Sequence, residues 1–275
     1  KINVLGVYPK FPETFWGFKK ALEYIGKKAV MTPTGLATVA AMMPEENFNF
    51  QKIVDINIES LTDEQIKDSD IIFTSSMVIQ EDSHNEVIGR AHFYNKKVVA
   101  GGPFPTSYPE RNEKADYTIA GEAEITLFPF LEDLLAGIPQ KRYTEKEIIA
   151  SKRTSQYLTS NNKPKLEQTP IPRWDLLDLE AYSTAAIQYS RGCPFNCEFC
   201  DITKLFGRVP RAKLPEQITK ELDSLLEENY EDSVFIVDDN FIGNKKEVRK
   251  LLPVLSKWGE KIITLLHFLQ KLVQI

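Results

Sequence analysis

The stretch RGCPFNCEFCDI, residues 191–202, contains all three cysteines of this 275-residue chain. Cys193, Cys197 and Cys200 follow AAIQYS (185–190), an apolar run that is typical of a buried strand. Three thiols in one loop can bind metal, but a structural zinc site would require a fourth ligand, and the chain has no fourth Cys. An iron–sulfur cluster held by three Cys keeps one open iron position. The spacing therefore predicts a metal site that accepts an external ligand, with a zinc knuckle or buried free thiols as the alternatives.

A helix–strand–helix pattern follows the cysteine loop. We expect an amphipathic helix over 215–229, which begins at a Pro, then a strand over 233–239 (SVFIVDD). A second helix is expected over 244–259, kinked or offset at Pro253. Strand, loop, helix, strand and helix in this order begin a parallel barrel or another parallel α/β sheet, in which the loops after the strands form the site.

Residues 1–137 alternate short apolar runs with amphipathic segments. The runs are rich in Val and Ile and are predicted as strands: 2–9, 52–58, 70–76, 97–103 and 116–121. Helices are predicted at 62–68, where Thr62 and Gln65 have capping-box spacing, and at 124–137. This alternation predicts a parallel, doubly wound sheet. Its ligand is expected beyond the carboxyl ends of the strands, near residues 9–14, 75–77, 101–105 and 121–124.

The segment between the two patterned regions is different. Residues 138–184 are polar and Pro-containing, which predicts a surface connector that can include a short hairpin. The predicted organisation is therefore a doubly wound α/β domain over 1–137, a linker over 138–184 and a second α/β domain over 185–275.

The overall composition is that of a soluble globular protein, with 42% hydrophobic and 27% charged residues. The net charge of −5 argues against a nucleic-acid partner, which usually requires a basic face. No stretch approaches the roughly 20 apolar residues of a transmembrane helix. Three clustered cysteines do not form a disulfide framework, so we expect a cytoplasmic protein.

The segment CPFNCEFC resembles the signature of radical S-adenosylmethionine (SAM) proteins, in which an aromatic residue precedes the last Cys. This resemblance implies that Cys193, Cys197 and Cys200 hold a [4Fe-4S] cluster and that SAM chelates the open iron. It further implies that one electron from the cluster cleaves SAM to methionine and a 5′-deoxyadenosyl radical.

The same resemblance suggests which residues contact SAM. Phe199 would pack near the adenine. Asp238 or Asp239, at the end of the strand over 233–239, would bind the SAM ammonium group through a charge-assisted hydrogen bond. The alternative is an ordinary strand-end turn, where Asp is common.

The N-terminal region is similar to the cobalamin (B12)-binding domain of the radical SAM group that includes hopanoid methylases. The segments that carry this resemblance are MTPTGLATVAAMMP (31–44), VDINIESL (54–61), GGPFPTSYPE (101–110) and AGEAE (120–124). The resemblance implies a doubly wound, Rossmann-like B12-binding domain followed by an incomplete (β/α) radical SAM barrel.

Glycines and hydroxyl groups at the predicted strand ends are the candidate cobalamin contacts. Glycine allows close approach of a corrin or its nucleotide tail, and hydroxyls can bind amides or phosphate. The candidates are Ser75, Ser76, Gly101, Gly102, Thr106 and Glu122. The alternative is that a flavodoxin-like sheet carries such residues at its strand ends in any case.

One motif of many B12 proteins, Asp-x-His-x-x-Gly, is only half present. Asp82-Ser83-His84 matches its start, but Val87 stands where Gly is required. We therefore interpret His84 as a surface residue and expect cobalamin to bind with no protein imidazole on cobalt.

The last residues, 262–275, lack the pattern of a third barrel strand, whereas barrels of this family have about six strand–helix units. Read alone, they suggest a short amphipathic helix. The genetic code permits a shifted reading frame here that resembles the family's third strand. We therefore expect a frameshifted remnant and an inactive or poorly active truncated chain, with a genuine short tail as the alternative.

The resemblance implies a cobalamin-dependent radical SAM enzyme that methylates an unactivated carbon. Its partners would be a small-molecule substrate, with a polycyclic lipid as one candidate, and an electron donor such as flavodoxin or ferredoxin. The alternatives are radical rearrangement or bond formation without methyl transfer, and a non-catalytic protein that binds corrinoid or cluster.

Overall fold

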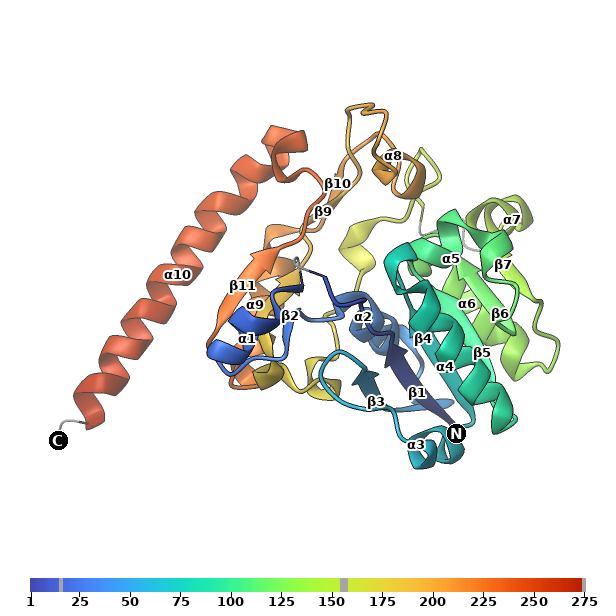
Figure 1. Ribbon diagram of the computed structural model, residues 1–275. Coiled ribbons are helices and arrows are strands. Elements are labelled where there is room, and N and C mark those ends of the chain that lie inside the picture. Colours follow the sequence, from blue (N-terminus) through green and yellow to red (C-terminus); the bar gives the residue numbers. More distant parts are fainter. Residues whose placement is uncertain (15–16, 154–157, 274–275) are drawn as a thin grey trace.

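The computed structural model describes residues 1–14, 17–153 and 158–273, with side chains described up to residue 262. Within these residues the chain forms a six-stranded and a three-stranded parallel sheet, which lie next to each other, and a short antiparallel pair (Figure 1). The architecture is therefore the mixed α/β fold with a parallel sheet that the sequence predicts.

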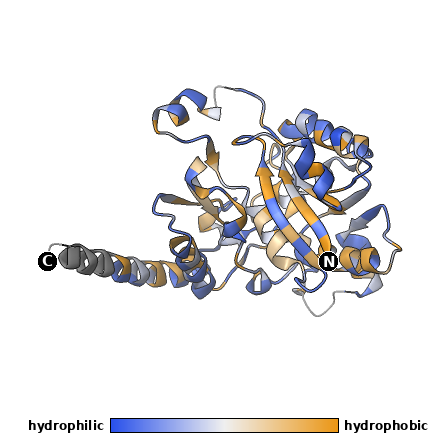
Figure 2. Cartoon of the chain, turned by 90° about the horizontal axis from the view of Figure 1, so that it is seen from below, coloured by the Kyte–Doolittle hydropathy of each residue, from blue (hydrophilic) through white to orange (hydrophobic). Residues whose placement is uncertain are grey.

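The large sheet has the strand order β3-β1-β4-β5-β6-β7, and all of its pairs are parallel. Its strands are β1 (Ile2–Tyr8), β3 (Phe48–Asp55), β4 (Ile71–Ser75), β5 (Lys97–Gly101), β6 (Tyr117–Ala120) and β7 (Arg142–Thr144). The sheet is largely hydrophobic, as Figure 2 shows for the strands near the N-terminus. Its apolar runs are therefore buried between helices, as parallel sheets require.

Helices cover both faces of the large sheet. One face packs against α2 (Thr34–Met42), α6 (Ala123–Leu135) and α7 (Glu145–Ser151), and the other against α3 (Asp63–Asp68) and α4 (Glu81–Phe93). Ile72 and Phe73, neighbours on β4, belong to opposite cores because successive strand residues point to opposite faces. Thr62 caps α3 through a complete capping box with Gln65, which confirms that prediction.

The small sheet has the order β11-β8-β2 and packs against α9 and the first part of α10. Figure 1 shows α10 on the far side of this sheet from the large sheet. The elements of this half are β2 (Ala29–Met31), β8 (Tyr182–Ile187), β11 (Ser233–Ile236), α1 (Lys19–Tyr24), α9 (Pro215–Glu227) and α10 (Lys245–Val273). Leu251 of α10 belongs to this core.

The antiparallel pair and several single turns complete the described structure. The pair consists of β9 (Ser190–Arg191) and β10 (Arg211–Ala212), and the short α-helices are α5 (Pro103–Ser107) and α8 (Ile202–Leu205). The 3-10 turns are η2 (Val78–Gln80), η3 (Pro109–Arg111), η5 (Leu166–Gln168), η6 (Trp174–Leu176), η7 (Leu179–Ala181) and η8 (Phe241–Asn244).

Strand β2 comes from the N-terminal half but pairs with β8 of the small sheet. The ladder is extended by two hydroxyls, because the Ala186 N–H donates to Thr32 Oγ1 at 2.9 Å and Thr34 Oγ1 donates to the Ala186 carbonyl at 2.6 Å. Thr34 is the first residue of α2, which packs on the large sheet. Helix α2 is therefore tied to both sheets.

The structure differs from the sequence expectations in several elements. The predicted connector contains β7, which extends the large sheet, and α7, which packs on it. It also buries Leu166 and Trp174. Its expected hairpin corresponds to an antiparallel bridge between Leu158 and Pro164. The expected strand over 185–190 is divided into β8, which already begins at Tyr182, and β9. The domain bounds 1–137, 138–184 and 185–275 stay predictions.

Helix α10 continues without interruption through Pro253 to Val273. The prediction that this helix ends at residue 259 was therefore wrong. Residues 274–275, and the side chains from residue 263 onward, lie outside the described structure, so the frameshift hypothesis for 262–275 stays a prediction. Among the described residues, no helix is both long and apolar enough to cross a membrane.

Candidate functional site

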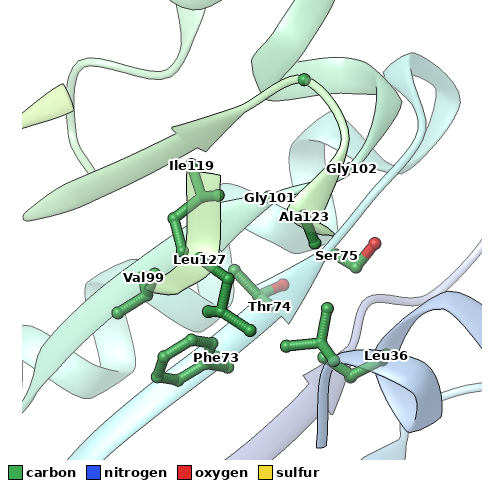
Figure 3. A pocket seen from close by; sticks show the side chains of 12 residues that line it. Leu36, Phe73, Thr74, Ser75, Val99, Gly101, Gly102, Ile119, Ala123 and Leu127 are labelled. Atoms are coloured by element: carbon green, nitrogen blue, oxygen red, sulfur yellow. The ribbon is translucent and has the colours of Figure 1, made fainter. Parts of the chain in front are cut away.

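A small apolar cavity lies at the carboxyl ends of β4, β5 and β6, between α2 and α6. Its volume is about 50 Å³, and its walls include residues of all five elements. Figure 3 shows the side chains of Leu36, Phe73 and Leu127 around the same space. The cavity is where a doubly wound sheet binds its ligand, beyond the carboxyl ends of its strands.

Two glycines bring bare backbone to the rim of this cavity. Gly102 has φ +91°, and a Cβ there would lie 2.6 Å from Ser75 Oγ. Gly121 has φ +102°, and a Cβ there would lie 2.4 Å from Glu145 Cγ. Side chains are excluded at both positions by conformation and by space. The strand ends can therefore approach a ligand closely.

The structure divides the candidate cobalamin contacts into two groups. Ser75, Gly101 and Gly102 line the cavity. Thr106 instead links two rim loops, since its Oγ1 donates to the Gly102 carbonyl at 2.7 Å and accepts from the Gly121 N–H at 2.9 Å. The remaining two candidates, Ser76 and Glu122, are buried and have their side chains engaged elsewhere.

His84 is not a surface residue, so that interpretation was wrong: its exposed fraction is 0%. Its Nδ1 lies 3.2 Å from Ser76 Oγ and its Nε2 lies 2.8 Å from Asn112 Oδ1. Burial lowers the pKa of His84, which favours the neutral ring. The sequence did contain the signal, because His84 lies at helical spacing from the apolar residues 87, 88 and 91 and so shares their face of α4. Both ring nitrogens are occupied within the fold, which leaves neither for cobalt.

Replacement of His84 by Ala is expected to destabilise the fold by about 2–4 kcal/mol, because Asn112 and Ser76 lose a buried partner. Denaturant unfolding measures this loss. With cobalamin added, the electron paramagnetic resonance spectrum of Co(II) should be the same for both chains. Nitrogen splitting that is present in the wild type and absent from the variant would contradict the assignment.

The cysteine loop is the second part of the site. Cys197 is exposed and Cys193 and Cys200 are half-buried. Two hydrogen bonds hold Cys193: its N–H donates to the Gly207 carbonyl at 3.2 Å, and Asn240 Nδ2 donates to its Sγ at 3.5 Å. Among the described residues, no three Cys, His, Asp or Glu side chains are gathered as a metal site. The donor set, three thiols on one accessible loop, nevertheless matches an iron–sulfur cluster with one open iron.

The predicted SAM contacts lie around this loop in different environments. Phe199 is 92% exposed, so it packs against nothing in this structure. The Asp238 carboxylate accepts hydrogen bonds from the backbone N–H groups of Tyr189 and Ser190 and from Ser190 Oγ, so it fixes the turn between β8 and β9. Burial raises the pKa of Asp239. Asn240, which contacts Cys193, was not among the predicted site residues.

A salt-bridge network joins the cavity rim to the cysteine loop. It consists of three acids and three bases, which balance in charge: Glu122, Glu124, Glu145, Lys163, Arg191 and Arg211. Arg211 binds both oxygens of Glu122, at 2.9 and 3.1 Å. Arg191 reaches Glu122 at 2.9 Å and Glu124 at 3.0 Å. The Glu122 carboxylate is thus committed to arginines and does not face the cavity as a free group.

The pKa of Glu124 predicts a dependence of stability on acid. Burial alone would raise this pKa, but the adjacent Arg191 charge, with hydrogen bonds from Arg191 and Thr169, lowers it to about 2. A carboxyl whose pKa is lowered by folding stabilises the fold above its ordinary pKa of 4.5, and this contribution is lost as the pH falls towards 2. The contribution is on the order of 3 kcal/mol.

We therefore expect the difference in unfolding free energy between wild type and Glu124→Gln to be largest at pH 5 and above. This difference should decrease steadily as the pH falls towards 2. Denaturant titrations of both chains across this range measure it. A difference that stays constant with pH would show that Glu124 has an ordinary pKa.

Comparison with known proteins gives the following matches. The B12 binding domain family matches residues 27–128. An uncharacterized methyltransferase of Synechocystis sp. is 44% identical over 262 residues, which cover 94% of this chain and 46% of that protein. The hopanoid C-2 methylase of Rhodopseudomonas palustris is 36% identical over 262 residues, covering 94% of this chain and 47% of the methylase. The chain thus spans about half the length of the curated relatives it matches.

The fold also matches a solved structure. The cobalamin-dependent S-adenosylmethionine radical enzyme OxsB, with aqua-cobalamin bound, superposes with a TM-score of 0.64 over 93% of this chain and 37% of OxsB. The sequence identity is 19%, so this likeness concerns the fold.

Proposed function

Because the chain belongs to the family of proteins that combine a cobalamin (B12)-binding domain with a radical SAM domain, we propose that it carries out cobalamin-dependent radical SAM methylation of an unactivated carbon. The proposed substrate is a small molecule, and a polycyclic lipid is one candidate because a relative is named as a hopanoid methylase. The proposed electron donor is a flavodoxin or ferredoxin, in the cytoplasm.

The observation that carries this proposal is the pairing of two unlike sites in one chain. An apolar cavity with bare glycine backbone at the strand ends suits close approach of a corrin or its nucleotide tail, and a loop with three thiols suits an iron–sulfur cluster with an open iron. A zinc knuckle accounts for the loop but leaves the cavity unexplained. Two cofactor sites joined by a buried salt-bridge network account for both.

Each cofactor would be held by residues described above. Ser75, Gly101 and Gly102 would contact cobalamin at the cavity rim, and Cys193, Cys197 and Cys200 would hold the [4Fe-4S] cluster. When bound, these groups with SAM would supply a radical for hydrogen abstraction and a methyl group for transfer. The chain itself would position the two sites and exclude water from the cavity, whose walls are mainly apolar.

The experiment is anaerobic reconstitution of the chain with iron, sulfide and hydroxocobalamin, followed by reduction and addition of deuterium-labelled SAM. A triterpenoid lipid fraction serves as the substrate probe. Because this chain is expected to be poorly active, we expect 5′-deoxyadenosine, S-adenosylhomocysteine and label in a lipid product at low yield. 5′-Deoxyadenosine without S-adenosylhomocysteine would favour radical chemistry that involves no methyl transfer. Binding of both cofactors with no SAM cleavage would favour a non-catalytic protein.

A further inference from the structure

Successive residues of the turn after β6 point alternately into the cavity and into the salt-bridge network. Gly121 and Ala123 line the cavity, while Glu122 and Glu124, which alternate with them, extend into the salt-bridge network. The Glu122 side chain is 1% exposed. A ligand that presses on this turn from the cavity side therefore acts on two buried carboxylates directly behind it.

The arginines of the network lie at the base of the cysteine loop. Arg191 on β9 and Arg211 on β10 are direct partners in the antiparallel pair, so the whole loop with its cysteines begins and ends between them. Two like charges in opposed positions repel, and Glu122, which binds both, offsets this repulsion. The closure of the loop therefore depends on a carboxylate that the cavity rim supplies.

The loop base is also closely packed. Gly192 has φ +94°, and a Cβ there would lie 3.0 Å from the Gly207 carbonyl oxygen. Arg211 Nη2 donates to the Phe206 carbonyl at 3.0 Å. A shift of either guanidinium would therefore move the backbone that carries Cys193. Closely packed groups of this kind transmit a displacement of the guanidiniums to the loop backbone, whereas loosely packed side chains would absorb it.

From these contacts we propose that the salt-bridge network couples cobalamin binding in the cavity to the conformation of the cysteine loop, with Arg191 as the positioning residue. The inference rests on the proposed function, since cobalamin is taken as the cavity ligand. Arg191 Nη1 donates to both Glu122 and Glu124, its Nη2 lies 3.0 Å from Glu124, and the side chain is only 13% exposed. Arg191 therefore follows the turn when the turn moves, because a separated buried charge is strongly unfavourable. The coupling is reciprocal: an ordered cysteine loop also strengthens cobalamin binding.

The test measures hydrogen exchange by mass spectrometry in the full chain without iron, with and without hydroxocobalamin. In the wild type we expect cobalamin to slow exchange both in the cavity rim and, by about tenfold, in residues 192–210. In Arg191→Met the rim should still be protected, whereas residues 192–210 should exchange at the same rate with and without cobalamin. Arg153→Met is the matched control, since it removes an arginine that binds Glu132 and Asp133 on α6, and should behave as the wild type.

Arg191→Lys provides a second variant if Arg191→Met does not fold. It keeps the charge but lacks the planar fork that spans two carboxylates, so the protection of residues 192–210 should fall clearly below that of the wild type. The inference is overturned if cobalamin protects the rim alone in the wild type, or protects residues 192–210 equally in the Arg191 variants. Absence of bound hydroxocobalamin in equilibrium dialysis would instead refute the proposed cobalamin site, and the coupling with it.

Discussion

Glu122→Gln is expected to lower the free energy of unfolding by about 3–5 kcal/mol, the range for removing one partner from a buried ion pair. The carboxylate is 1% exposed and binds Arg211 through both oxygens and Arg191 through one. Its replacement leaves two opposed guanidiniums with one fewer anion between them. Glutamine has nearly the same shape, so the loss reports charge and hydrogen bonding, with little contribution from packing.

Denaturant unfolding at neutral pH measures this effect. Glu132→Gln is the matched control, because Glu132 is 70% exposed and pairs with Arg153 at the surface of α6. Exposed pairs contribute about 0–1 kcal/mol, so the control should unfold within that margin of the wild type. Equal losses in the two variants would mean that the salt-bridge network is solvated in solution and does not join the two halves of the chain.

The large sheet could be predicted because its signals are local. Strands β1, β4, β5 and β6 coincide with Val- and Ile-rich runs within a few residues, and the capping box at Thr62 marked the start of α3. Strand β3 was expected to begin at residue 52 and instead begins at Phe48. Its first residues alternate between buried and exposed positions, which is a weaker signal than a continuous apolar run.

Strand β2 could not be predicted from such patterns. It has only three residues, Ala29–Met31, and its stability comes from β8, more than 150 residues away in the sequence, and from the hydroxyls of Thr32 and Thr34. A strand that depends on tertiary pairing of this kind shows no hydrophobic periodicity in the sequence. The connection of both sheets through α2 is therefore a property that only the structure reveals.

The sequence indicated where the cavity lies, but not which side chains point into it. The sequence placed cavity residues at the strand ends, and Ser75, Gly101 and Gly102 line the cavity there. Glu122 was expected to contact cobalamin, but its neighbours Gly121 and Ala123 line the cavity, and its own carboxylate binds Arg211. The segment AGEAE does not specify which of its residues point to the cavity, because that depends on arginines about 70 to 90 positions later.

Replacement of Cys193, Cys197 and Cys200 together by Ala is expected to reduce bound iron from about four per chain to almost none after anaerobic reconstitution. No other Cys exists in the chain, so no thiol can replace them. Bound iron and acid-labile sulfide, measured with the visible absorption of the cluster, give the result. Phe195→Ala is the matched control, because Phe195 lies in the same loop, is 62% exposed and offers no donor atom.

The stability of the iron-free chains separates a ligand role from a structural role. None of the three cysteines belongs to a hydrophobic core, so the triple variant should unfold within about 0.5 kcal/mol of the wild type. A large loss of stability would identify the thiols as packing residues. Full iron content in the triple variant, or binding of zinc alone by the wild type, would refute the cluster assignment. If iron is lost while the apo fold is unchanged, the cysteines serve to bind the cluster, and the structural cores on either side of the loop form without it.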